Sequence, residues 1–369
     1  MFETSTSMTD LKSFLKQLLS LPGLSAYEAP VRDAIAEAWK PLVDELSVSR
    51  LGSLHGLKRG SGPEGARPRI LLAAHMDAIG LMVTGVSEGG LLRVFRVGGV
   101  DPRILPGMPV KVFATGARGD QPQALPAIIV QPPDSLLPAS LNGKPVKIQY
   151  LLVDTGLEPD TVRELVRVGD VVSFDTQPAE LTGEAITGHS LDNRASVTAV
   201  TAALDALQSM RHAWDVYAAA TVSQDETLGG GFTSPYATRP QIAVAVDVTH
   251  ASGPGASDWR THPLGKGPTL DWGPNTHPAL FDAFKEVAER TEIPYNVSVY
   301  PSGSGTDAMG MQIVAEGIPT MVVSIPLRYM HTPVEEVSMK DINRTGRLLA
   351  EFIAGLQPEF VDKIKYAEE

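Results

Sequence analysis

Residues 70–74 form an uninterrupted apolar run, Ile-Leu-Leu-Ala-Ala, between Pro68 and the polar His75. A strand that is buried on both faces of a sheet has this pattern, because helices cover both of its sides. After residue 185 the chain alternates between strand and helix patterns. The expected helices are 195–209, 278–290 and 339–356, and the expected strands are 216–222, 242–246, 297–300 and 321–325. This alternation predicts an α/β fold with a mainly parallel, mixed sheet and helices on both faces.

Residues 81–184 show a different pattern. Short β-rich pieces alternate with Gly and Pro turns, and one helical stretch, about 158–166, interrupts them. This pattern predicts a small β domain that is inserted into the α/β domain. We therefore expect a discontinuous main domain, residues 1–80 and 185–369, and an inserted domain, residues 81–184. The chain length of 369 residues suits two domains.

Cysteine is absent from the chain, which excludes disulfides, thiol nucleophiles and cysteine-ligated clusters. Any metal site must therefore use His, Asp and Glu. The 31 basic and 43 acidic side chains give a net charge of −12, which argues against nucleic acid as a partner. The N-terminus does not resemble a signal peptide, and no apolar run approaches the roughly 18 residues of a membrane helix. We expect a cytoplasmic protein without a membrane partner.

Candidate site residues follow the expected strands directly. His75 and Asp77 follow 70–74, Asp225 and Glu226 follow 216–222, Asp247 follows 242–246, His331 follows 321–325, and Asp192 opens the helix after the insertion. In open α/β sheets, functional groups collect at the carboxyl ends of the strands. We therefore expect these side chains to converge at one edge of the sheet.

Imidazole nitrogens and carboxylate oxygens are ligands for zinc, cobalt and manganese. A pair of metals about 3.5–4 Å apart needs a bridging carboxylate and further ligands on either side. Asp192 suits the bridge, with His75 and Glu226 or Asp247 and His331 as the outer ligands. Of the two adjacent acids, one could bind metal while the other, Asp225, activates water as a general base. Asp77 is expected to orient the His75 imidazole.

Simpler explanations exist for each of these residues. An Asp after a strand is commonly a helix cap or a turn residue, and Asp192 would suit the N-cap of the next helix. The adjacent Asp225 and Glu226 could lie in a solvated loop, and His250 could line the same pocket. The glycine-rich segment 302–307 lacks the spacing of a nucleotide-binding loop, so we interpret it as a loop that closes over substrate. The coincidence of all the acids and histidines at strand ends favours a metal site.

Six motifs occur in order along the chain: Ala-His-Met-Asp-Ala-Ile-Gly at 74–80, Leu-Asp-Asn-Arg at 191–194, Gln-Asp-Glu at 224–226, Val-Asp-Val-Thr at 246–249, Gly-Thr-Asp-Ala at 305–308 and Pro-Leu-Arg-Tyr-Met-His at 326–331. Together they resemble the tetrahedral (TET-type) metalloaminopeptidases, a family of glutamyl and leucyl aminopeptidases with some members labelled endoglucanase. Within the insertion, Val-Gly-Gly-Val-Asp-Pro-Arg at 97–103 and Val-Gly-Asp-Val-Val at 168–172 are similar as well. The resemblance spans nearly the whole chain.

The resemblance implies a zinc-peptidase-like fold and an aminopeptidase with two zinc or cobalt ions per chain, with manganese as an alternative. It places His75 on one metal and Asp192 on the bridge, and Glu226, Asp247 and His331 complete the two coordination spheres. Asp225 stands at the position of the general base. Members of this family assemble through the inserted domain into dimers and then into twelve-subunit tetrahedra that enclose a chamber. The resemblance therefore also implies a homo-oligomer that acts on peptides.

Three features differ from the family pattern. Asp225 stands where the family typically has Glu, segment 227–232 departs from Val-Gly-Leu-Arg-Gly-Ala, and Ala78 replaces an acid. The metal-ligand positions are intact, so we predict a dinuclear metalloaminopeptidase that removes N-terminal residues from peptides. The alternatives are a related amidohydrolase or deacylase, a glycoside hydrolase, and a metal-binding cage subunit with little turnover.

Overall fold

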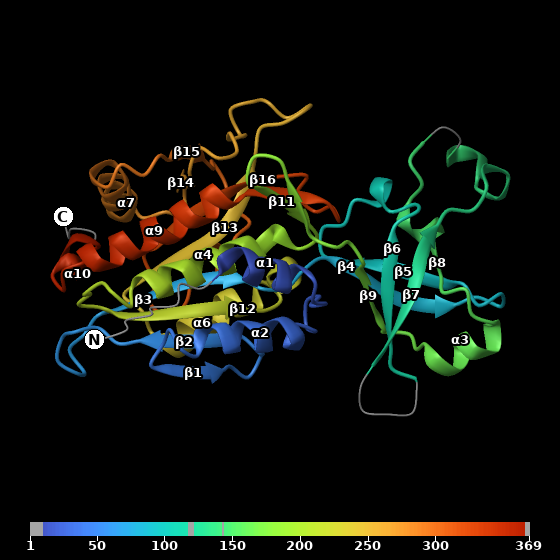
Figure 1. The fold of residues 1–369 in the computed structure, drawn as a ribbon, viewed down its shortest axis with the longest axis horizontal. Helices are drawn as coiled ribbons and strands as arrows, with labels where there is room; N and C mark the ends of the chain where they lie inside the picture. The colour runs from blue at the N-terminus through green and yellow to red at the C-terminus, as the bar shows by residue number, and fades with distance from the viewer. Residues whose placement is uncertain (1–9, 117–121, 142–143, 366–369) are drawn as a thin grey trace, which may run out of the picture.

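The computed structural model describes residues 10–116, 122–141 and 144–365. Over these ranges the strands form two separate sheets (Figure 1): a large mixed sheet of 11 strands and a small closed barrel. The barrel stands to one side of the large sheet and its helices. No helix in the described ranges has both the length and the apolar character that crossing a membrane requires.

The large sheet has parallel strands at its centre and antiparallel strands toward its edges. Its order is β1 (Glu45–Val48), β2 (Leu54–Lys58), β12 (Asp215–Thr221), β3 (Arg69–His75), β13 (Ile242–His250), β16 (Thr320–Arg328), β17 (Glu335–Ser338), β11 (Ala185–Gly188) and β10 (Ala179–Leu181). Strand β14 (Thr269–Trp272) pairs with β16 and with β15 (Asn296–Val299). The neighbours β12, β3, β13 and β16 all run parallel. The predicted mixed α/β sheet is confirmed.

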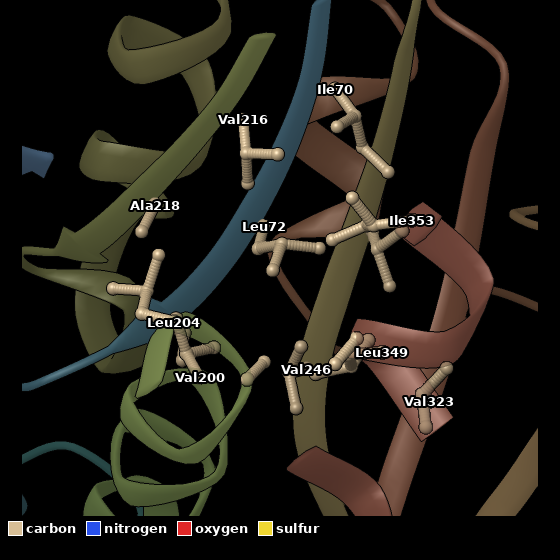
Figure 2. Close-up of a cluster of buried hydrophobic side chains, with 14 of the residues drawn as sticks. Ile70, Leu72, Val200, Leu204, Val216, Ala218, Val246, Val323, Leu349 and Ile353 are labelled. Carbon is tan, nitrogen blue, oxygen red and sulfur yellow. The ribbon is translucent and has the colours of Figure 1, made fainter. Parts of the chain in front are cut away.

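Helices cover both faces of the large sheet. On one face lie α1 (Leu11–Leu19), α2 (Ala29–Trp39), α4 (Leu191–Ala206), α7 (Pro278–Arg290), α9 (Met339–Gly355) and the short α10 (Phe360–Lys363). Ile70 and Leu72 of β3 point to this face and pack with Val200 of α4 and Leu349 of α9 (Figure 2). Leu71, the residue between them, belongs to the opposite face, because successive side chains of a strand alternate in direction.

The opposite face is covered by α6 (Gly229–Thr238) and α8 (Ala308–Met311), which contact each other and the central strands. Its core is made of small and medium side chains, including Ala73 of β3, Ala245 of β13 and Met311 of α8. The two apolar faces explain why 70–74 has no polar position: each of its residues is buried by a helix layer. One further short helix, α5 (Gln224–Thr227), follows β12 at the edge of the sheet.

The barrel is closed in the order β4 (Gly80–Val86), β5 (Leu92–Val97), β8 (Leu152–Asp154), β7 (Gln123–Val130), β6 (Pro109–Ala114) and β9 (Val171–Phe174). Helix α3 (Pro159–Leu165) packs Val162 into its core. The described parts of its connections contain the 3-10 turns Pro102–Ile104, Asp134–Leu136, Ala139–Leu141 and Ile148–Tyr150. The barrel strands lie in the predicted interval 81–184 except for Gly80, the first residue of β4. Strand β10, also within the interval, pairs with β11 in the large sheet.

Candidate metal centre

The central parallel strands all end at the same edge of the large sheet, and the candidate residues gather there. His75 is the last residue of β3, Asp247 lies in β13, and His331 follows β16. Asp192 lies in the first turn of α4, where its backbone is not helical, with φ −79° and ψ 102°. A cleft of about 360 Å³ at this edge is lined by His75, Gly99, Asp192, Gln224, Asp225, Asp247, Val248, Thr249, His250, Tyr300, Ser304, Gly305, Thr306, Met330 and His331.

Asp192 lies between the two histidines. Its Oδ1 is 3.2 Å from Nε2 of His75, and its Oδ2 is 3.4 Å from Nε2 of His331. Each oxygen of the Asp192 carboxylate thus lies close to a different imidazole ring. This is the arrangement that a carboxylate shared between two metal ions requires.

His75 is buried and has carboxylates on three sides. Its Nε2 lies 4.0 Å from Oδ1 of Asp247, and its Nδ1 lies 3.2 Å from Oδ1 of Asp77. Burial alone would lower the pKa of His75, but Asp192 and Asp77 raise it well above its usual value. Burial also raises the pKa of Asp247 well above its usual range. Potential ligand atoms of His75, Asp192 and Asp247 lie within 4.8 Å of one another.

Crowded carboxylates of this kind fit divalent cations. Burial of Asp225, together with the neighbouring charge of Asp77, raises the pKa of Asp225 to about 7. Asp192, Asp225 and Asp247 lie close together, and the described residues of the cleft lining include no lysine or arginine, so the three carboxylates repel one another unless cations neutralise them. The donor set of imidazoles and carboxylates matches zinc, cobalt and manganese.

Asp77 supports the site from behind. It is completely buried and accepts hydrogen bonds from the Ser25 hydroxyl at 2.6 Å and from the backbone N–H groups of Gln224 and Asp225 at 3.1 and 3.2 Å. Burial would raise the pKa of Asp77, but its contacts with His75 and Ser25 lower it overall. Asp77 therefore fixes both the His75 ring and the start of α5.

Glu226 does not join the other predicted ligands. Its side chain is exposed, and its Oε1 accepts a hydrogen bond from the backbone N–H of Gly98 in the barrel at 2.5 Å. Asp225 instead lies in the cleft, with a carboxylate oxygen within 4.8 Å of ligand atoms of His75 and Asp77. Successive residues on a helix project about 100° apart, so adjacent acids on α5 face different surroundings. The structure brings the predicted residues together with the exception of Glu226.

Glu335, which supports the site, was missed from the sequence. Glu335 is buried in β17, and its carboxylate accepts hydrogen bonds from the backbone N–H of Asp192 at 3.0 Å and of His331 at 2.9 Å. Its only sequence signal is its position four residues after His331. Gln224, from the Gln-Asp-Glu motif, also lines the cleft beside Asp225.

A buried arginine ties the site to α1. Arg194 lies in α4, two residues after Asp192, and donates hydrogen bonds to the carbonyls of Leu18 and Leu21 at 2.5 and 2.7 Å. Its burial lowers the pKa of the guanidinium to about 10, while Asp77 and Glu335 favour its charged form. Arg194 balances part of the negative charge behind the cleft.

The chain is similar to known aminopeptidases over most of its length. Residues 52–348 match the family described as M42 glutamyl aminopeptidase. The chain is 33% identical to the lysyl aminopeptidase of Pyrococcus furiosus, over 93% of this chain and 97% of the relative. A putative aminopeptidase of Acetivibrio thermocellus is 34% identical over 93% of this chain and 98% of its own length.

Solved structures are similar over the same extent. A TET aminopeptidase from a marine sediment thaumarchaeote superposes with a TM-score of 0.89 at 28% identity and covers 96% of this chain and 99% of its own. An aminopeptidase of Desulfurococcus kamchatkensis superposes with a TM-score of 0.87 at 33% identity. The match covers 97% of this chain and 98% of that aminopeptidase.

Proposed function

The chain belongs to the M42 glutamyl aminopeptidase family and is a metal-dependent aminopeptidase, and we propose that it works with two divalent ions bound at the cleft. This membership bears out the family resemblance of the sequence motifs. The observation that carries the two-ion proposal is the position of Asp192, whose two oxygens face His75 and His331 separately. Zinc or cobalt suits these donors, and manganese is a further candidate.

The proposed ligands differ in one residue from the sequence-based set. His75, Asp247 and Asp192 would hold one ion, and Asp192, His331 and Asp225 would hold the other. Asp225 replaces Glu226 in this role, because the Glu226 carboxylate is bonded to Gly98 outside the cleft. The proposed role of Asp225 therefore changes from general base to ligand.

Bound ions supply a Lewis acid for the peptide carbonyl and the attacking water. The chain's own residues hold the site in place: Asp77 fixes the His75 ring, and Glu335 fixes the backbone of Asp192 and His331. The free α-amino group of a peptide would offer its nitrogen lone pair to a bound metal ion, whereas an acylated N-terminus would not. This difference favours peptides with an unblocked N-terminus and thereby favours removal of the first residue.

Peptide hydrolysis with and without added metal tests this proposal. We expect release of N-terminal residues with zinc or cobalt, loss of release with a chelator, and no release from an N-acetylated copy of the same peptide. Cleavage of the acetylated copy would favour the deacylase or amidohydrolase alternative. Hydrolysis of a glycan that resists the chelator would favour the glycoside hydrolase. Two bound metals without hydrolysis of any peptide would leave only the metal-binding cage subunit.

We also propose that the chain forms a homo-oligomer, with the barrel as the dimer contact and a tetrahedral dodecamer as the full assembly. One TET1 structure is described as a dodecamer, and the Pyrococcus horikoshii TET1 peptidase as assembling into a tetrahedron or a large octahedral shell. The barrel exposes Phe95 and Val168, at 52% and 69%, which a partner subunit would cover. Light scattering gives the mass: twelve subunits support the proposal, and a monomer contradicts it.

A further inference from the structure

Glu28 is a buried acid without a role in the proposed metal centre. It lies between α1 and α2, its exposed fraction is 5%, and it is not among the described residues that line the cleft. One oxygen of its carboxylate, Oε1, accepts hydrogen bonds from the backbone N–H groups of Ala26 and Ser223, both at 2.9 Å, and from the Ser223 hydroxyl at 3.4 Å. Glu28 therefore connects a turn near the start of the chain with the residue that precedes α5.

The turn that contains Glu28 also reaches the end of β3. Leu24 forms a parallel β-bridge with Ala78, and the Ser25 hydroxyl donates a hydrogen bond to Oδ2 of Asp77 at 2.6 Å. Residues 24–28 thus contact the segments that follow β3 and β12, and both of these segments carry site residues.

The start of α5 is held by two carboxylates from different parts of the chain. Glu28 accepts the backbone N–H of Ser223. Asp77 accepts the next two backbone N–H groups, those of Gln224 and Asp225. The first N–H groups of a helix have no partner within the helix, so these two acids determine where the turn lies.

Ser223 has a left-handed backbone conformation, with φ 54° and ψ 37°. Residues other than glycine adopt this conformation rarely, and it persists where the surrounding structure holds it. Glu28 contacts both the N–H and the hydroxyl of this residue. Without Glu28, Ser223 can relax toward a more common conformation, and the turn that follows it would move.

Asp225 is sensitive to such a movement because its side chain is short. Two torsion angles place an aspartate carboxylate, one fewer than in glutamate, so its position follows the backbone closely. One carboxylate oxygen of Asp225 lies within 4.8 Å of ligand atoms of His75 and Asp77. A displacement of about 1 Å at such a site can cost about 10²-fold in rate.

We infer that Glu28 is a positioning residue, which holds the backbone at Ser223 and thereby sets where the Asp225 carboxylate lies in the cleft. This inference rests on the proposed function, in which Asp225 takes part in the metal centre. Glu28 acts through the position of its accepting oxygen and not through its charge. Because Oε1 alone accepts all three hydrogen bonds, a neutral side chain with one oxygen at the same place can do the same.

Three substitutions of Glu28 separate the position of the acceptor from the charge. Glu28→Gln keeps one oxygen and loses the charge, Glu28→Asp keeps the charge and withdraws both oxygens by about 1.5 Å, one C–C bond, and Glu28→Ala removes both. We expect Glu28→Gln to retain most of the wild-type kcat for an unblocked peptide in excess zinc. Glu28→Asp and Glu28→Ala should lose about 10- to 100-fold in kcat, with KM little changed because residue 28 lies outside the cleft lining.

Zinc affinity is the second measurement, by competition with a chelating dye. The affinity of the weaker of the two sites should fall by about 10- to 100-fold in Glu28→Asp and Glu28→Ala but not in Glu28→Gln. Glu37, an exposed acid of α2, provides the control, and its substitution by Gln, Asp or Ala should change neither measurement. Thermal unfolding gives a temperature at which all variants are folded. If Glu28→Ala does not fold, the comparison of Glu28→Asp with Glu28→Gln decides.

The outcomes separate this inference from the proposed function. If the wild type cleaves peptides and Glu28→Asp is as active as Glu28→Gln or more so, the inference is wrong and the proposed function stands. Lower thermal stability with an unchanged kcat would likewise reduce Glu28 to a structural role. If the wild type binds two zinc ions without cleaving any peptide, the zinc affinities of the variants decide the inference alone. If the wild type binds no zinc, the proposed metal centre and the inference fall together.

Discussion

Gly99 of the barrel connection lies directly against His331 of the large sheet: a Cβ atom at Gly99 would come within 2.5 Å of Nδ1 and 2.8 Å of Cε1 of the imidazole. The neighbouring Gly98 donates its N–H to Glu226 on α5. The barrel and the large sheet therefore meet at the proposed metal centre. A side chain at residue 99 would displace a proposed ligand.

Gly99→Ala should consequently weaken metal binding at the His331 side. The methyl group cannot fit beside the ring, so His331 must turn away from Asp192. We expect one of the two zinc ions to be lost, or its affinity to fall by about 10- to 100-fold, a range typical of disturbed ligand orientation. Titration calorimetry measures this. Gly89 lies in a turn of the same barrel with open space around an added Cβ, so Gly89→Ala should bind zinc like the wild type. Equal zinc affinity and stoichiometry in Gly99→Ala and Gly89→Ala would contradict the packing argument.

Glu335→Gln should also weaken metal binding, through the backbone. The two carboxylate oxygens accept one N–H each, from Asp192 and His331. A Gln side chain has only one oxygen, and its NH₂ group would face the second N–H donor. We expect zinc affinity to fall about 10- to 100-fold in equilibrium competition with a chelating dye. Glu316→Gln, an exposed acid, is the matched control, and an unchanged affinity in Glu335→Gln would show that Glu335 does not position the ligands.

The two adjacent acids of α5 should respond differently to amide substitution. Asp225→Asn removes a proposed ligand from the cleft and should reduce zinc content from two ions per chain to one. Glu226→Gln removes a charge that lies outside the cleft and keeps an oxygen that can accept the Gly98 N–H, so it should retain both ions. Metal analysis of the purified variants by mass spectrometry gives the counts. If Glu226→Gln lost an ion and Asp225→Asn kept both, Glu226 would be the ligand, as the sequence motifs imply.

Asp271 should make the stability of the protein depend on pH. It is buried in β14 and accepts hydrogen bonds from the Thr269 and Ser324 hydroxyls at 2.7 and 2.8 Å, and no cation among the described residues lies beside it. Burial raises the pKa of Asp271 from 3.8 to about 7. A raised acid pKa means that the folded state holds the proton more tightly than the unfolded state. The contribution to stability is therefore complete below about pH 4 and is lost as the pH rises to about 7.

Asp271→Asn removes this pH dependence, because the amide stays neutral. The free energy of unfolding of the variant minus that of the wild type should increase between pH 5 and pH 8 by about 3 kcal/mol, because about two of these pH units lie below the raised pKa of about 7 and each contributes about 1.4 kcal/mol. Urea unfolding of the two proteins at both pH values measures this change, and the common effect of the other groups cancels in the difference. The same difference at pH 5 and pH 8 would show that Asp271 does not titrate in this interval.

The fold was largely predictable because its signals are local. The apolar runs at 70–74, 242–246 and 321–325 correspond to β3, β13 and β16, since a strand buried on both faces must be apolar throughout. The order in which strands pair is not local, so the closed barrel and the position of β10 in the large sheet could not be read from the sequence. Helix α4 begins at Leu191, earlier than the expected residue 195, and includes the non-helical Asp192.

The sequence predicted which residues lie at the strand ends that form the site, but it did not predict the direction in which each side chain points. His75, Asp192, Asp247 and His331 each follow or open an element at one edge of the sheet, and the structure places them together. The adjacent acids Asp225 and Glu226 carry no signal for which one faces inward, because that depends on the start of α5 and on Gly98 of the barrel. Glu335 acts on two backbone groups, a role that follows from tertiary packing alone.

The most direct measurement is a crystal structure of the zinc-loaded protein with anomalous scattering recorded at the zinc edge. The account predicts two anomalous peaks about 3.5–4 Å apart, with Asp192 between them, Asp225 on the ion that His331 binds, and Glu226 still bonded to Gly98. A single peak, or Glu226 on a metal with Asp225 free, would contradict the proposed metal centre.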